Sequence, residues 1–152
     1  MTATDTLARL GIVLPAPAAA IAAYVPFVRS GNWLIISGQL PLLEGKLVAS
    51  GHLGGTVSIE AGQQAARQSA INLLAQANMA LGTLDKVVRV VRLGGFISCT
   101  ADFIDHAKVM NGASEVMESV FGEVGRHART TIGVPSLPLG AAVEVEGLFE
   151  VA

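Results

Sequence analysis

Charged and aromatic side chains are scarce in this chain of 152 residues. Charged residues make up 14% of the sequence and aromatic residues 5%, and the ten basic residues are scattered along a chain of net charge −2. A nucleic-acid partner is therefore not expected, because binding a phosphate backbone requires clustered positive charge. The single cysteine, Cys99, excludes an internal disulfide, and since no histidine neighbours it in the sequence we expect a small buried hydrophobe there.

Long apolar runs are also missing. No uninterrupted stretch of about 18 apolar residues is present, so no membrane-spanning segment is expected. The N-terminal stretch resembles a signal peptide only superficially, because Asp5 precedes its apolar part and Pro15 and Pro17 interrupt it. We therefore expect a cytoplasmic protein. The three histidines lack metal-ligand spacing and no cofactor motif is present, so neither a metal nor a cofactor is expected.

The length of the chain suits one domain, 1–152, in which residues 1–20 form an Ala/Pro-rich extension. Hydrophobic residues make up 51% of the sequence and the mean hydropathy is +0.55. These values indicate more apolar surface than a monomer of this size usually buries, and exposed apolar patches usually mark interfaces. We therefore expect a homo-oligomer.

The pattern of apolar, capping and turn residues predicts an α+β domain of order ββαβαββ with both helices on one face of a single sheet. Ser58 is a candidate N-cap for the first helix, and Gly82 is a candidate stop. Residues 40–56 are Gly-rich and are expected to be irregular, and Gly94-Gly95 indicates a bulge or a close approach within the third strand. The expected strands are 24–29, 33–38, 86–98, 129–134 and 142–151, and the expected helices are 59–81 and 103–121.

The stretch from His127 to Val134, followed by Leu137-Pro138 and residues 143–146, sets one arginine and one carboxylate on two consecutive strands of an apolar region. Arginine cannot shed its proton, so a guanidinium in such a region needs a protein carboxylate or a ligand anion. No acidic residue occurs in the sequence between Arg129 and Glu144. This pattern leaves room for an anionic ligand.

Structural explanations exist for the same residues. Arg129 and Glu144 could instead form an ion pair between subunits, and Glu144 shares its strand parity with Glu146 and Glu150, which is also the pattern of a solvated face. Tyr24 could stack on a flat substrate or simply pack in the strand. Asn111 could be an ordinary surface amide of the second helix.

From about Tyr24 to the C-terminus the chain resembles the Rid family, also called the YjgF or L-PSP endoribonuclease family. Thr130-Thr131 stands where many members have Ser-Cys, and the long loop after Pro41 is typical of a divergent chorismate-mutase-like branch. The segments that carry the resemblance are Tyr24, Ser37-Gly38-Gln39-Leu40-Pro41, Asp102-Phe103 with Asn111, and the block from Ala128-Arg129 through Leu137-Pro138 to Val143-Glu144.

This resemblance implies a chorismate-mutase-like fold, packed as a homotrimer with ligand pockets between subunits. It implies that Arg129 grips the carboxylate of a small 2-imino acid and that Glu144 positions or activates the attacking water. Residues that would line the pocket are Tyr24, Gly38, Asn111 and Thr131. The expected reaction is cofactor-free hydrolysis of 2-imino or enamino acids to 2-keto acids and ammonia.

One alternative is a non-catalytic protein that binds or senses a small carboxylate such as a 2-keto acid. Endoribonuclease activity is a third possible function, and the acidic pI disfavours it.

Overall fold

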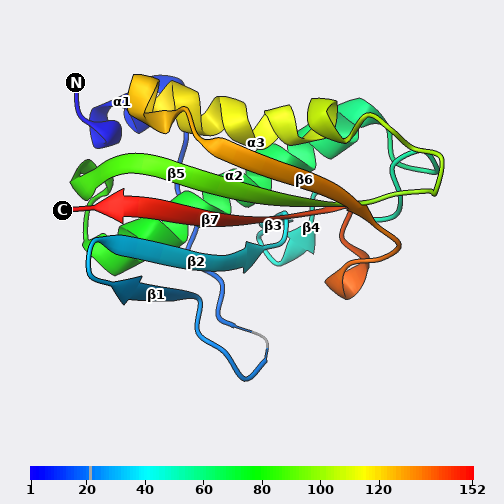
Figure 1. Cartoon of the computed structure of the whole chain (residues 1–152), viewed down its shortest axis with the longest axis horizontal. Coiled ribbons are helices and arrows are strands. Elements are labelled where there is room, and N and C mark those ends of the chain that lie inside the picture. The colour runs from blue at the N-terminus through cyan, green and yellow to red at the C-terminus, as the bar shows by residue number, and fades with distance from the viewer. Residues whose placement is uncertain (21) are drawn as a thin grey trace.

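Five strands form one mixed sheet in this computed structural model, which describes residues 1–20 and 22–152 (Figure 1). β5 and β6 run parallel, and the other neighbouring strands are antiparallel. The C-terminal strand lies at the centre of the sheet, and β6 lies at one edge. The order across the sheet is β1 (Phe27–Ser30), β2 (Trp33–Gln39), β7 (Val143–Val151), β5 (Val87–Ser98) and β6 (Ala128–Val134).

Two long helices cover one face of this sheet, as the sequence predicts. α2 (Ile59–Leu81) begins where the Ser58 hydroxyl accepts a hydrogen bond from the Ala61 N–H at 3.1 Å, and it ends at Gly82, whose φ of 81° is left-handed. It packs mainly on β7 and β2, whereas α3 (His106–Phe121) packs on β5 and β6. The predicted α+β class is confirmed. No helix among the described residues is long and apolar enough to cross a membrane.

A third helix, α1 (Ala3–Leu10), lies near the N-terminus, and the predicted pattern of two helices was wrong in omitting it. The N–H of Asp5 donates to the Thr2 hydroxyl at 3.0 Å, and the Asp5 carboxylate accepts from the Thr2 N–H at 3.1 Å. Leu7 is buried in the common core. A helix of this length is only marginally stable in isolation, and its formation therefore depends on this cap and on docking against the core. The periodicity of the sequence alone does not reveal that docking.

The segment predicted to be irregular contains a small hairpin of β3 (Leu42–Leu43) and β4 (Lys46–Leu47). The two residues of its turn, Glu44 and Gly45, have φ values of 52° and 78°. Positive φ at both central positions is the geometry that tight hairpins favour. The prediction of an irregular loop was therefore wrong for these residues.

Two local predictions also need correction. Tyr24 precedes β1 rather than lying in it. Residues 103–105 are not helical, so the second expected helix begins at His106. At Gly94-Gly95 the structure confirms one of the two predicted alternatives, a close approach, because the register shifts in β5 fall between Val87 and Arg92 instead.

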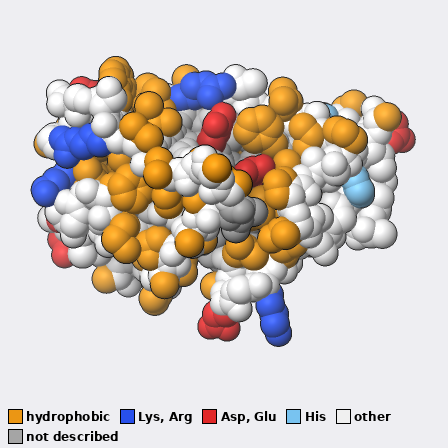
Figure 2. All heavy atoms as spheres, turned by 90° about the horizontal axis from the view of Figure 1, so that it is seen from below, with side chains coloured by type: hydrophobic (Ala, Val, Ile, Leu, Met, Phe, Trp, Pro, Cys, Tyr) orange, Lys and Arg blue, Asp and Glu red, His pale blue; other side chains and the backbone are white. Residues whose placement is uncertain are grey.

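The face of the sheet opposite the helices carries apolar side chains that the chain itself leaves uncovered. Along β7, buried residues alternate with half-buried ones, and Glu144 and Glu146 belong to the half-buried set. On β2, Trp33 and Ile35 are 46% and 49% exposed, and on β6 Ile132 is 47% exposed. Figure 2 views the molecule from the side of β1 and shows hydrophobic side chains over much of that side as well. Monomers rarely leave so much apolar surface open, so we regard this face as a candidate interface.

Candidate functional site

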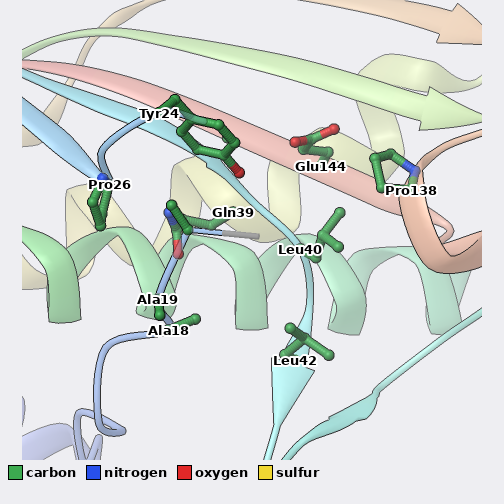
Figure 3. A pocket seen from close by; sticks show the side chains of 11 residues that line it. Ala18, Ala19, Tyr24, Pro26, Gln39, Leu40, Leu42, Pro138 and Glu144 are labelled. Atoms are coloured by element: carbon green, nitrogen blue, oxygen red, sulfur yellow. The ribbon is translucent and has the colours of Figure 1, made fainter. Parts of the chain in front are cut away.

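Glu144 lines a small cavity of about 70 Å³ between the centre of the sheet and the segment that precedes β1 (Figure 3). Its walls are mostly apolar, and the polar groups are the Glu144 carboxylate, the Gln39 amide and the Tyr24 phenol. We call this cavity the acid pocket. It brings together three of the predicted residues, Tyr24, Gly38 and Glu144.

The Ser37-Gly38-Gln39 segment builds the wall of the acid pocket. The Ser37 hydroxyl donates to the Val25 carbonyl at 2.8 Å and so holds the strand against the residues next to Tyr24. The Gln39 amide donates to the Ser37 carbonyl at 3.0 Å. Between them the register with β7 shifts, and Gly38 faces the Glu144 side chain so closely that a Cβ there would lie 2.9 Å from its Cδ. A glycine at this position makes room for the carboxylate.

The environment of Glu144 favours its protonated form. Burial in the apolar pocket raises the pKa of this carboxyl above its ordinary value, and the negative charge of Glu146 raises it further. Among the residues that the structure describes, no cation forms an ion pair with Glu144. A carboxylate with a raised pKa is a stronger base than an ordinary glutamate, so it is better suited to accept a proton and to return it.

Arg129 lies in a second hollow, between β6 and α3. One guanidinium nitrogen, Nη1, donates to Asn111 Oδ1 at 2.9 Å and to Ser114 Oγ at 3.1 Å, and Nη2 donates to the Ala107 carbonyl at 3.4 Å. These acceptors are all neutral, and within the described ranges 1–20 and 22–152 no carboxylate pairs with this guanidinium. The full positive charge is therefore held in place without being neutralised. We call this region the arginine hollow.

His127 extends the hydrogen-bond network of the arginine hollow. Its Nδ1 donates to the Gly125 carbonyl at 2.7 Å, which leaves Nε2 free to accept from the Ser114 hydroxyl at 2.9 Å. Burial lowers the pKa of His127, and the charge of Arg129 lowers it further, although the Gly125 carbonyl opposes this shift. A neutral His127 thus orients Ser114, whose oxygen in turn accepts from Arg129. The sequence analysis did not identify Ser114 or the role of His127. The only hint in the sequence was that His127 lies two residues before Arg129.

The two charged groups do not meet within one chain. β6 and β7 are consecutive in the sequence, but β5 lies between them in the sheet. Arg129 hydrogen-bonds to residues of α3 on the helical face, whereas Glu144 points to the opposite face beside Gly38. The structure therefore divides the predicted residues between the acid pocket, with Tyr24, Gly38 and Glu144, and the arginine hollow, with Arg129 and Asn111.

Thr131 and Cys99 lie outside both hollows. The Thr131 hydroxyl is buried and has no hydrogen-bond partner among the described residues. Cys99 does have a histidine beside it in space, since its Sγ lies 3.5 Å from Nε2 of His106, seven residues away in the sequence. Cys99 is half-buried and packs against the core, as expected, but the sequence did not reveal its contact with His106 because that contact is formed in space and not along the chain.

The chain is similar to known proteins over nearly its whole length. The family model described as "YjgF/chorismate_mutase-like, putative endoribonuclease" matches residues 4–151. Protein TCP17 of Trypanosoma cruzi is 49% identical over 145 residues, which cover 95% of this chain and 91% of that protein. The chain belongs to the YjgF/chorismate mutase-like family.

Solved structures agree with this assignment. A protein of unknown function from Agrobacterium tumefaciens is 42% identical, with a TM-score of 0.92 over 99% of this chain and 92% of that one. A putative endoribonuclease from Shewanella oneidensis is 35% identical, with a TM-score of 0.96 over 99% of this chain and 100% of that one. The fold assignment therefore extends over nearly the whole chain, including the N-terminal segment.

Proposed function

We propose that the protein hydrolyses 2-imino and enamino acids to 2-keto acids and ammonia, in a cleft where the arginine hollow of one copy meets the acid pocket of the next. The observation that carries this proposal is the separation of two complementary groups. A guanidinium held by neutral acceptors and a carboxyl with a raised pKa lie on opposite faces of one sheet, and neither has an ion-pair partner among the described residues.

The assembly that we propose is a homotrimer. Joining the hollow of one copy to the pocket of the next is a head-to-tail contact, and such contacts either close into a ring or continue as a filament. The exposed apolar side chains Trp33, Ile35 and Ile132 would supply the surface that closes the ring. The family resemblance favours three copies.

Arg129 would bind the substrate carboxylate. A guanidinium can form two parallel hydrogen bonds to a carboxylate, and this fixes both the position and the plane of the substrate. Asn111 and Ser114 hold the guanidinium before the substrate arrives, so little ordering is left to occur on binding. Tyr24 would cover the planar imine from the acid-pocket side.

Glu144 would manage the protons of the reaction. As water adds to the carbon of the protonated imine, the electron pair of the C=N bond moves to nitrogen and Glu144 accepts a proton from the water. This proton passes to the nitrogen. Glu144 then accepts the hydroxyl proton, the electron pair of that O–H bond forms the carbonyl of the 2-keto acid, and ammonia leaves with the electron pair of the C–N bond. Holding water and imine together removes much of the entropic barrier.

An assay with an amino acid oxidase tests this function. The oxidase releases the imine, semicarbazide traps what is not hydrolysed, and the protein should speed formation of the keto acid at the expense of the trapped product. Arg129→Ala should abolish the gain, whereas Arg67→Ala, which removes an exposed arginine of α2, should retain it. Equal rates with and without the native protein would overturn the proposal.

Two other outcomes would replace this function with another. Thermal stabilisation by 2-keto acids without any turnover of imines would favour a protein that binds or senses small carboxylates. Cleavage of RNA that disappears in Arg129→Ala would favour an endoribonuclease.

A further inference from the structure

A second and larger cavity, of about 610 Å³, adjoins the acid pocket. It lies between the N-terminal segment 13–18 and the β3–β4 hairpin, over α2. Ala18 and Leu42 line both cavities, so they form the boundary between them. Figure 3 shows these two side chains on one side of the acid pocket, with Glu144 and Tyr24 on the other.

Two buried amides of α2, one helical turn apart, hold the walls of this cavity. Gln76 is 1% exposed, and its amide donates to the Ala18 carbonyl at 2.8 Å. Asn72 is 7% exposed, and its amide nitrogen donates to the carbonyls of Leu40 and Leu42, both at 2.9 Å. Breaking such bonds would leave buried polar groups without partners, which is costly. The two walls are therefore fixed by the fold on either side of the boundary.

The lining of the larger cavity suits an apolar group. Apart from Glu44 and Gly45 at the exposed hairpin turn, the side chains that line it are aliphatic or proline, with Asn72 as the one polar group of the inner wall. Both hydrogens of the Asn72 amide are already donated, and its oxygen accepts from Gln68 at 3.0 Å. A ligand group in this cavity finds few free hydrogen-bonding partners, so burial of apolar surface is its main source of affinity.

We propose that the larger cavity holds the side chain of the substrate, so that the preferred substrates are 2-imino acids with long apolar side chains. This inference rests on the proposed function of the acid pocket. With the reacting carbon beside Glu144, a substrate side chain of several carbons would pass between Ala18 and Leu42 and end among the residues of the N-terminal segment. The small side chain of Ala18 would leave room for this passage.

Substrate selectivity tests the proposal. The native protein should hydrolyse the imine derived from leucine at least about tenfold faster, in kcat/KM, than the imine derived from alanine. Ala18→Leu should narrow the passage and reduce this ratio to about one, mainly by slowing the leucine-derived imine. Ala22→Leu makes the same change at an exposed position that lines neither cavity and should keep the native ratio. Since Ala18 is exposed and Gln76 holds its carbonyl rather than its side chain, the variant should still fold.

A binding measurement separates failure of this inference from failure of the proposed function. Calorimetry should show at least about tenfold tighter binding of 4-methyl-2-oxopentanoate than of pyruvate, and Ala18→Leu should remove the difference. This preference would support the cavity assignment even if no imine were hydrolysed. Imine hydrolysis with equal kcat/KM for both side chains in the native protein, or an unchanged ratio in Ala18→Leu, would overturn the assignment and leave the proposed function intact.

Discussion

Replacing Gly38 with alanine would displace the Glu144 carboxyl without removing it. The new Cβ would lie 2.9 Å from Glu144 Cδ and 3.0 Å from its Cγ. Carbon atoms normally pack at about 3.5–4.0 Å, so the carboxyl must move by about 0.5–1 Å. Gly38 is not among the glycines with positive φ, so the backbone itself accepts alanine. The substitution therefore acts on the position of one functional group.

The expected result is a large loss of activity with a small loss of stability. Misplacing a reacting group by about 1 Å can cost about a hundredfold in rate. The half-buried Glu144 side chain can adjust at a cost of about 0.5–1.5 kcal/mol for an off-rotamer conformation. We expect kcat/KM in the oxidase-coupled assay to fall between tenfold and about a hundredfold. Urea denaturation should show destabilisation within that range of free energy.

The chain provides a matched control on the same face of the sheet. A Cβ at Gly94 would lie 2.8 Å from Cγ and 3.2 Å from Cδ of Glu146, which is nearly the same clash with the neighbouring glutamate. Gly94→Ala should therefore have a similar effect on stability but leave kcat/KM within a few-fold of the native value. Equal losses of activity in the two variants, or none in Gly38→Ala, would refute the assignment of Glu144.

Four further substitutions test the electrostatics and the unpaired hydroxyls. Because the folded state raises the pKa of Glu144, this group stabilises the protein below its ordinary pKa of 4.5 and loses that contribution as pH rises through the folded value. Glu144→Gln should therefore be more stable than the native protein at pH 7 but not at pH 4, and a less stable variant at pH 7 would indicate a structural ion pair instead. The lowered pKa of His127 stabilises the protein above its ordinary pKa of 6.5, and this contribution is lost as pH falls. His127→Gln should flatten the stability profile below pH 6.5, and an unchanged profile would contradict a neutral buried histidine. Thr131→Val removes a buried hydroxyl without a partner and should raise the free energy of unfolding by about 1 kcal/mol. Ser69→Ala, a second such case, should do the same without altering activity, whereas loss of activity in Thr131→Val alone would show that the Thr131 hydroxyl contacts the substrate.

The local chemistry of residues along the chain was sufficient to predict much of the fold. Ser58 and Gly82 mark the ends of α2 because capping and left-handed backbone are properties of single residues. The alternation along β7 predicts which side chains are buried, since successive residues of a strand face opposite sides. By contrast, the β3–β4 hairpin is too short to leave a period, and it depends on contacts such as those of Asn72 with Leu40 and Leu42. The short helix α1 depends on docking, since Leu7 is buried in the common core.

The sequence by itself determined which residues of the candidate site carry charge, namely Arg129 and Glu144, and it led us to expect an anionic partner for the guanidinium. Only the tertiary structure decided where these groups lie. β5 lies between β6 and β7 and so separates Arg129 from Glu144, and the pairing of the strands turns the two side chains to opposite faces of the sheet. The order of strands in a sheet follows from pairing between distant segments, and no local pattern of residues encodes it. For the same reason, the contact of Ser114 with His127 and the cavity bounded by Ala18 and Leu42 emerge only when the chain is folded.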